Sequence, residues 1–299
     1  MSLPSLQTML NTGLPVTICA RPWARELLSG FDHADFIEMK GRWHEDRAAV
    51  SIHKKRARHL HARGLLLPDS LSSAMVFKFA GVPSAGYRDD GRSLILRWPI
   101  DKPAAPMHAV RSWHHITTQA LKRWNLPAHP VEPGPELGLK TTPRQRDEAL
   151  AALAAAGLAP GRFILIAPTA TGLHRGKVKV WPDFDGLTRS LQSRGHDVAM
   201  CPPPSELDAA RRNAPTAHCL AALSLGAFAT LTRLALLVVC NDSGVSHLAA
   251  ASNARQLTLF GVTHQERTGP WSRNAACLGS AHKWPSLADV EQRIDSLLR

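Results

Sequence analysis

The stretch VVCNDSGVSHLAAAS, residues 238–252, places Asn-Asp-Ser-Gly between an apolar run and a helical pattern of small residues. The apolar run predicts a buried strand, and the pattern from Gly244 onward predicts a helix. Asp242 and Ser243 therefore lie where a strand ends and a helix begins. Both residue types are common helix N-caps, because their oxygens accept hydrogen bonds from the first turn. Taken alone, the stretch is compatible with a capping role or a ligand-binding role.

The neighbouring sequence, from residue 160 to 270, alternates short apolar runs with helical patterns. The expected strands are residues 163–168, 197–200, 234–239 and 256–260, and the expected helices are 182–195, 205–213, 224–233 and 244–252. Alternation at these lengths indicates βαβ units and a parallel sheet. Ligands bind such sheets at the carboxyl ends of the strands, which is where Asp242 and Ser243 fall.

The first half of the chain follows the same alternation less regularly. The expected strands are residues 15–20, 36–39, 65–67, 84–87 and 93–98, and the expected helices are 1–10, 23–31, 53–64, 70–81 and 108–124. The Pro/Gly-rich stretch at 126–145 predicts a boundary between two α/β domains, residues 1–135 and 146–299. Because the first element resembles a helix, we expect the opening strand and the loop after it to lie outside this sequence.

The charge balance indicates an anionic partner. The 299 residues include 36 Lys and Arg against 24 Asp and Glu, a formal net charge of +12. A basic surface of this size suits nucleic acid, an anionic membrane leaflet or a phosphorylated ligand. The densest run, HKKRARHLHARG at 53–64, is also typical of a solvated helix face. Aromatic residues are only 6% of the chain and do not interleave with the basic ones, so nucleic acid is not expected as a partner.

Other classes of protein are disfavoured. No window approaches the length of apolar sequence that a membrane span needs, and residues 1–10 lack the features of a secretory signal. The cysteines are widely spaced and predict reduced thiols in a cytoplasmic protein: Cys19, Cys201, Cys219, Cys240 and Cys277. The histidines show no zinc-ligand spacing with cysteine. The acids of Asp183-Phe184-Asp185 fit the first turn of a helix, so neither a metal nor another cofactor is expected.

Two loops are suited to phosphate. A helix that begins at Gly244 offers free N–H groups and the positive end of its dipole, and His247 follows one turn later. A histidine packed against the sheet is the alternative for His247. The second loop, PTATGLHRGKVKVWP at 168–182, supplies hydroxyls, flexible backbone and the cation of Lys179. Two such loops at strand ends are the pattern expected for a diphosphate.

These motifs carry a resemblance to a known family. NDSGVSHLAAASNARQLTLFGVTHQERTGP, at 241–270, closely resembles the signature of glycosyltransferase family 9, the bacterial heptosyltransferases of the lipopolysaccharide inner core. Lys179-Val180-Trp181-Pro182 matches the family's Lys-x-Trp-Pro, and LSL at 223–225 matches the segment before the last helix and strand. LLLPDSLSSAMVFKFAGVPSAGYRDDGRSLIL, at 65–96, is most similar to the type that adds the second heptose.

The resemblance implies a GT-B fold, two Rossmann-like doubly wound parallel-sheet domains facing across a cleft. It also implies an inverting, metal-independent transfer of heptose from ADP-heptose to a phosphorylated lipid A-core acceptor. The carboxyl-terminal domain would hold the donor, and the amino-terminal domain would face the acceptor. Together with the net charge, this places the protein in the cytoplasm, peripheral on the anionic inner face of the inner membrane.

The resemblance also implies roles for single residues. Lys179 would neutralise charge on the leaving group, and Glu206 would accept hydrogen bonds from the ribose, although it also fits an acid in a helix's first turn. Leu223 would contact adenine, although it also fits the core. The remaining positions would line the diphosphate: Thr169 or Thr171, Asp242, Ser243, Gly244 and His247.

One element of the family pattern has no match. The family's catalytic base is an aspartate in a Gly-Asp pair after the first strand, and MSLPSL, at 1–6, corresponds to the residues just after that pair. No other carboxylate, Asp69 included, matches the position, so the general base is expected to be absent from residues 1–299. Two alternatives to the transferase therefore remain: a relative that binds nucleotide sugar without turnover, and a polyanion-binding protein without enzymatic activity.

Overall fold

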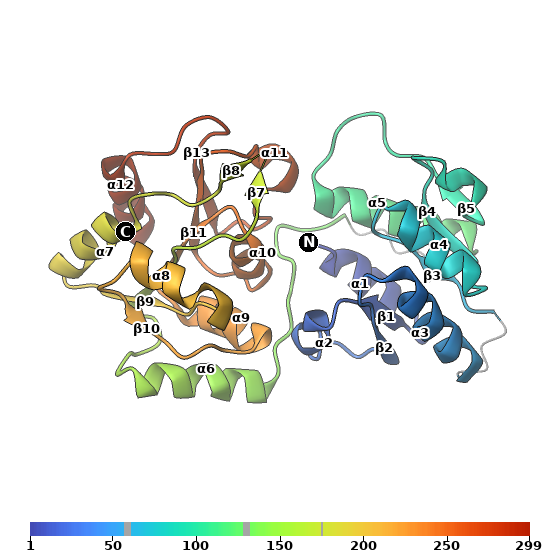
Figure 1. Ribbon diagram of the computed structural model, residues 1–299, viewed down its shortest axis with the longest axis horizontal. Helices are drawn as coiled ribbons and strands as arrows, with labels where there is room; N and C mark the ends of the chain where they lie inside the picture. Colours follow the sequence, from blue (N-terminus) through green and yellow to red (C-terminus); the bar gives the residue numbers. More distant parts are fainter. Residues whose placement is uncertain (57–60, 128–131, 175) are drawn as a thin grey trace. The chain divides into compact units, whose positions relative to one another are not determined.

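A computed structural model describes residues 1–56, 61–127, 132–174 and 176–299. The chain forms two compact units, Met1–Gly134 and Pro135–Arg299, and both are built from parallel strands and helices (Figure 1).

The sheet of the second unit has six strands, all paired in parallel, in the order β10-β9-β6-β11-β12-β13. The strands are β6 (Phe163–Ala167), β9 (Asp197–Met200), β10 (His218–Cys219), β11 (Leu237–Asn241), β12 (Gln256–Phe260) and β13 (Ala275–Gly279). From β6 the chain winds outward through β9 and β10, then returns to β11 on the other side of β6. The strand order therefore reverses between β6 and β11, the position where open α/β sheets bind ligands.

Helices cover both faces of this sheet. They are α6 (Pro143–Ala155), α7 (Phe184–Ser193), α8 (Leu207–Asn213), α9 (Leu225–Leu234), α10 (Gly244–Ala251), α11 (Gln265–Thr268) and α12 (Leu287–Leu298), with a 3₁₀ turn η2 (Pro204–Glu206) and an antiparallel hairpin of β7 (Leu173–His174) and β8 (Lys177–Val178). Alternate residues of β6 serve the two faces. Ile164 and Ile166 pack with α7 and α12, whereas Phe163 and Leu165 pack with α6, α9 and α10. Such two-sided burial explains why these strands are continuous apolar runs.

The first unit contains two parallel sheets that share no strand pairing in the described part of the chain. One pairs β1 (Thr17–Ala20) with β2 (Asp35–Glu38), and the other orders β3 (Gly64–Leu65), β4 (Ser84–Tyr87) and β5 (Trp98–Ile100). The helices are α1 (Leu3–Leu10), α2 (Trp23–Leu27), α3 (Trp43–Arg56), α4 (Leu71–Phe79) and α5 (Ala109–Arg123), with a 3₁₀ turn η1 (Arg92–Leu94). Val50 of α3 and Val76 of α4 share a buried cluster with Ile37 of β2.

The α/β class and the parallel sheet predicted from the sequence are confirmed, but two predicted elements are wrong. Residues 93–98 were expected as a strand, yet Arg92–Leu94 form a 3₁₀ turn and the strand starts at Trp98. Asp90 and Gly91 both have positive φ, 51° and 75°, so the backbone turns sharply before Arg92 and cannot extend.

The helix expected at 53–64 lies further upstream, at Trp43–Arg56. Its start is fixed by Asp46, whose carboxylate accepts hydrogen bonds from the backbone N–H groups of Lys40 and Gly41. Residues 57–60 of the basic run lie outside the described residues, and 61–63 are not helical. Within the described part of the chain, every helix is too short or too polar to span a bilayer.

Candidate functional site

The last residue of β11, Asn241, holds both ends of the segment that carries Lys179. Its amide nitrogen donates to the backbone oxygens of Ala167 (3.2 Å) and Thr169 (3.3 Å), and its side-chain oxygen accepts from the backbone N–H of Trp181 (2.8 Å). Asn241 is fully buried. We name residues 168–180 the Lys179 loop. Because one side chain bonds to the backbone on both sides of it, this loop is anchored at the carboxyl ends of β6 and β11.

Sequence reasoning did not single out Asn241. The signal available was a polar amide at the end of an otherwise apolar strand, where an unpaired side chain would be costly. Asn213 of α8 adds a further anchor, because its amide donates to the backbone oxygen of Pro168 at 2.7 Å.

Lys179 lies beside the first turn of α10. Its ammonium group donates to the backbone oxygen of Asp242 at 2.9 Å, and the side chain is half-buried. Since an ammonium group has three protons, the bond leaves two available to another acceptor. The structure thus brings together two predicted site residues that are 63 positions apart in the chain.

Asp242 is buried, and its carboxylate is hydrogen-bonded to the loop after β12. One of its oxygens accepts a hydrogen bond from the hydroxyl of Thr263 at 2.7 Å, and its backbone N–H donates to Leu259 at 3.2 Å. Thr263 is a second residue that the sequence reasoning did not list. Asp242 therefore fixes the strand end from which α10 departs.

The start of α10 is open. Ser243 caps the helix through a hydrogen bond from the N–H of Val245 to its hydroxyl at 3.3 Å. A Cβ built on Gly244 would meet no heavy atom of another segment within 4 Å among the described residues, so the space beside Gly244 is free. His247, one turn further along the same helix, is half-buried. Gly244 itself is exposed, so the backbone N–H groups and the positive end of the helix dipole are accessible there, an arrangement that binds anions.

Thr169, near the start of the Lys179 loop, is in contact with Glu206. The hydroxyl of Thr169 donates to the carboxylate of Glu206, which lies at the end of the 3₁₀ turn after β9. Thr171 is exposed, and Leu223 is half-buried against the core formed with α9. Neither forms a hydrogen bond with the other predicted residues in the part of the chain that the structure describes.

The cysteine next to Asn241 is a packed core residue. Cys240 is fully buried, and burial raises the pKa of its thiol to about 12. The neutral thiol is inert as a nucleophile at physiological pH.

Acids outside the site serve local roles. Asp185 forms an ion pair with Arg189 one turn later at 2.9 Å, as expected for an acid in the first turn of α7. Among the described residues, no group of three His, Cys, Asp or Glu side chains is placed to hold a metal ion.

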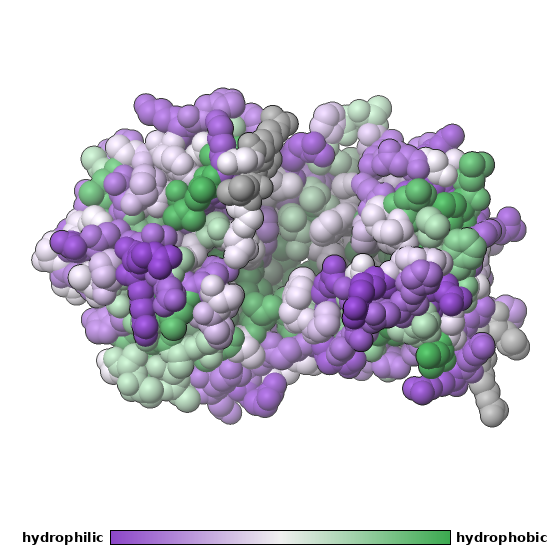
Figure 2. All heavy atoms as spheres, viewed as in Figure 1, coloured by the Kyte–Doolittle hydropathy of each residue, from purple (hydrophilic) through white to green (hydrophobic). Residues whose placement is uncertain are grey.

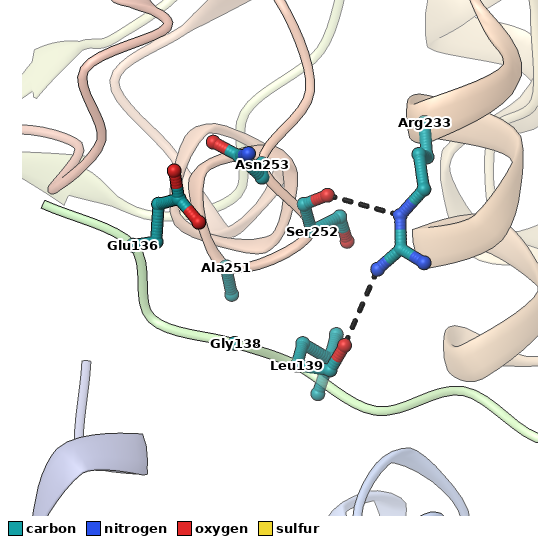
Figure 3. A pocket seen from close by; sticks show the side chains of 7 residues that line it. All are labelled: Glu136, Gly138, Leu139, Arg233, Ala251, Ser252 and Asn253. Carbon is teal, nitrogen blue, oxygen red and sulfur yellow. Dashed lines mark hydrogen bonds between the residues drawn. The ribbon is translucent and has the colours of Figure 1, made fainter.

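A separate cavity of about 330 Å³ lies at the other end of α10, and its lining includes Glu136, Leu139, Arg233 and Ser252 (Figure 3). Arg233 donates to the backbone oxygens of Ser252 (3.1 Å) and Leu139 (3.2 Å). It therefore fastens the segment that enters this unit to the carboxyl end of α10, where a cation is favourable. None of the predicted site residues lines this cavity.

Comparison with known families gives one match, to the model described as glycosyltransferase family 9 (heptosyltransferase), over residues 52–296. The chain belongs to glycosyltransferase family 9. The match includes every residue of the Lys179 loop and of α10, and it confirms the family predicted from the sequence motifs. The chain is accordingly a glycosyltransferase of this family. A comparison with curated protein sequences finds no match.

Solved structures of this family share the fold. Escherichia coli ADP-heptose lipopolysaccharide heptosyltransferase II is 22% identical, with 99% of this chain and 94% of that chain covered and a TM-score of 0.75. E. coli heptosyltransferase WaaC with ADP is 19% identical, with coverage of 99% and 95% and a TM-score of 0.75. A family 9 structure from Veillonella parvula is 12% identical, with coverage of 99% and 93% and a TM-score of 0.81. The predicted GT-B fold class is confirmed.

Proposed function

We propose that this glycosyltransferase moves a heptose from ADP-heptose to a phosphorylated lipid A-core acceptor, and that residues 146–299 bind the donor. The observation that carries the proposal is the meeting of the Lys179 loop with the open start of α10 at the point where the strand order reverses. Support comes from two similar structures, E. coli WaaC with ADP and with ADP-2-deoxy-2-fluoro heptose.

The diphosphate would lie in front of α10. Its oxygens would accept hydrogen bonds from the backbone N–H groups at Ser243 and Gly244, and His247 would donate from one turn further on. Gly244 permits close approach because it has no side chain. Asp242 would act through position, because its carboxylate already accepts from Thr263.

Lys179 would stabilise the negative charge that develops on the leaving ADP, the contribution that is usually largest in such reactions. Thr169 or Thr171 would add a hydroxyl to the phosphates. Glu206 would accept hydrogen bonds from ribose hydroxyls, and Leu223 would contact the adenine. The bond between Thr169 and Glu206 supports a continuous surface from the phosphate site to the ribose site.

The transfer itself would be an inverting displacement without a metal. A base removes the proton from an acceptor hydroxyl, the hydroxyl oxygen bonds to the anomeric carbon, and the bond from that carbon to ADP breaks. We assign no residue as the base. Residues 1–135 would lie on the acceptor side, and the net charge of +12 suits attachment to the anionic inner leaflet.

The direct test is a transfer assay with purified protein, ADP-heptose and a lipid A-core acceptor that lacks the heptose. The expected result is a heptose mass increment on the acceptor together with ADP release, both slowed about a hundredfold or more in Lys179→Met and retained in Lys177→Met. ADP binding without product would reduce the proposal to nucleotide-sugar binding. Transfer from a UDP-sugar in preference to ADP-heptose would contradict the proposed donor.

A further inference from the structure

The first unit presents a surface that the donor site does not explain. We name it the α3–α4 seam and define it by Trp43, Arg47 and Lys54 of α3 with Lys78 and Phe79 at the end of α4. Positions 43, 47 and 54 fall on one side of a helix. The ring of Trp43 lies 6.1 Å from the ring of Phe79, and the ammonium of Lys54 donates to the backbone oxygen of Gly81. Trp43, Phe79 and Lys54 therefore border one seam, with Arg47 on the same side of α3 and Lys78 next to Phe79 in the chain.

The two aromatic rings of the seam are exposed. Phe79 is 58% exposed and Trp43 is 38% exposed. The helices do not need these rings to pack, because Val50, Val76 and Ala80 already fill the buried cluster beneath them. Two adjacent exposed rings, one of them tryptophan, are typical of a surface that contacts something other than water.

The charge around the rings is strongly positive. Residues 40–56 together with Lys78 contain seven lysines and arginines and only two acids. Both acids are already engaged: Glu45 pairs with Lys40 at 3.2 Å and with Arg42 at 2.7 Å, and buried Asp46 accepts two backbone N–H groups. The described part of the chain offers no acidic partner to Arg47 or Lys78. In the region of α3, Figure 2 shows hydrophilic residues with hydrophobic ones among them.

We propose that the α3–α4 seam docks the protein on an anionic lipid bilayer. Trp43 and Phe79 enter the headgroup region, where tryptophan is enriched, while Arg47, Lys54 and Lys78 face the lipid phosphates. The apolar stems of the lysines would enter the headgroup region while their charged ends stay at the phosphates. The proposed function includes attachment to an anionic membrane, and the seam identifies the residues that would make that contact. This inference rests on the proposed function to that extent.

The rings favour lipid over nucleic acid. A base must stack on an open aromatic face, and the ring of His44 lies against that of Trp43, with centroids 4.1 Å apart and planes tilted by 43°. Phe79 meets Trp43 edge-on, at an interplanar angle of 60°, so the pair does not form a flat platform. Two tilted aromatic rings next to cations can insert into the interfacial zone of a bilayer, whereas they cannot stack with successive nucleobases.

The experiment is co-sedimentation of the full chain with vesicles of phosphatidylcholine alone and of phosphatidylcholine mixed with phosphatidylglycerol. We expect binding to the mixed vesicles only, weakened by salt. Arg47→Glu with Lys78→Glu should reduce the partition coefficient about tenfold or more, because two surface cations become anions. Trp43→Ser with Phe79→Ser should reduce it and leave the salt dependence unchanged. Circular dichroism and thermal unfolding identify any variant that fails to fold.

Matched controls are Arg144→Glu with Arg146→Glu on α6, which change the net charge equally, and Leu94→Ala, which removes an apolar side chain that is 89% exposed, the most among the large apolar residues that the structure describes. The controls should bind vesicles like the unmodified chain. Equal binding to both kinds of vesicle, equal loss in the controls, or no loss in folded seam variants would overturn the proposal. So would a single-stranded oligonucleotide that displaces the vesicles and depends on the same side chains. ADP binding is measured in parallel, so failure of the donor site is distinguished from failure of the seam.

Discussion

The side-chain oxygen of Asn241 accepts a hydrogen bond from the backbone N–H of Trp181, 60 residues earlier in the chain, at 2.8 Å. The same side chain donates to the backbone of Ala167 and Thr169. Because Asp242 follows directly and its backbone oxygen accepts a hydrogen bond from the ammonium of Lys179, one strand end organises both halves of the proposed donor site.

Asn241→Ala should lower both stability and donor affinity. The substitution removes two buried hydrogen bonds and one partly buried one, and leaves their backbone partners without this bond, so we expect a loss of about 2–4 kcal/mol in the free energy of unfolding. Urea unfolding measures that loss, and calorimetry measures ADP affinity in buffer, where the folded fraction dominates. Asn274→Ala removes an exposed amide that bonds to Asn253 and should leave ADP affinity unchanged. If the unmodified protein and Asn241→Ala bind ADP with equal affinity, the Lys179 loop does not need this anchor.

Lys179→Met should impair catalysis more than binding. Loss of one preorganised charge at a leaving group costs about 10²–10³ in kcat, whereas ground-state affinity for ADP should fall by about tenfold. Lys177→Met is the matched control, because Lys177 is an exposed lysine of the same loop, two residues before Lys179. Steady-state kinetics with varied ADP-heptose separates kcat from KM. Comparable kinetics for the two variants would remove Lys179 from the mechanism.

Gly244→Ala should weaken ADP binding without destabilising the fold. No heavy atom lies within 4 Å of the added Cβ, and alanine favours helix more than glycine, so the unfolding free energy should stay within about 0.5 kcal/mol. The new methyl group would occupy the space proposed for phosphate. Gly226→Ala should behave in the opposite way, because its Cβ would lie 2.1 Å from the side chain of buried Gln145, which caps α6. Unchanged ADP affinity in Gly244→Ala would place the phosphates elsewhere.

Asp69→Asn should destabilise the first unit more than Arg92→Met does. Arg92 is fully buried, and its guanidinium nitrogen lies 3.7 Å from a carboxylate oxygen of Asp69. Neutralising Asp69 removes the one carboxylate within 4 Å of this desolvated charge and leaves only the more distant Asp89 and Asp90, which costs about 3 kcal/mol. Removing the guanidinium instead leaves Asp69 paired with Lys102 at 2.9 Å, so the loss should be near 1 kcal/mol or less. Chemical unfolding of both variants checks the order, and the reverse order would contradict it.

Alkaline pH should lower stability through buried thiols. Burial raises the pKa of Cys240 to about 12 and that of Cys201 to about 11, from an ordinary value of 9.0. Above pH 9 the unfolded chain loses these protons and the folded chain keeps them, so stability falls by about 1.4 kcal/mol per pH unit for each thiol. Urea unfolding between pH 8 and 10.5 should show a shallower decline in Cys240→Ala. An identical decline would exclude the thiol as a cause.

Much of the second unit is predictable from its sequence, because strands that are buried on both faces consist of short, continuous apolar runs. FILIA at 163–167 and QLTLF at 256–260 are examples, and both are fully buried. The first unit is harder because its strands are short and its turns decide the path. The residues before Arg92 take positive φ, which composition alone did not reveal.

The site was predicted in part. Motif and strand position indicated Lys179 and Asp242, and the structure joins them by a hydrogen bond. Asn241 and Thr263 were not predicted, because their roles depend on bonds to distant backbone and side-chain atoms that local sequence does not show. The roles of Thr171 and Leu223 remain predictions.

The central claim is that the carboxyl ends of β6 and β11 bind an adenosine diphosphate group, and the most direct test is calorimetric titration of ADP and UDP into the full chain. The account predicts one ADP bound per chain, with weaker binding of UDP, because we propose that Leu223 contacts the adenine, whereas the proposed ribose contact of Glu206 would serve both nucleotides. Absence of ADP binding, or binding that does not distinguish ADP from UDP, would contradict it.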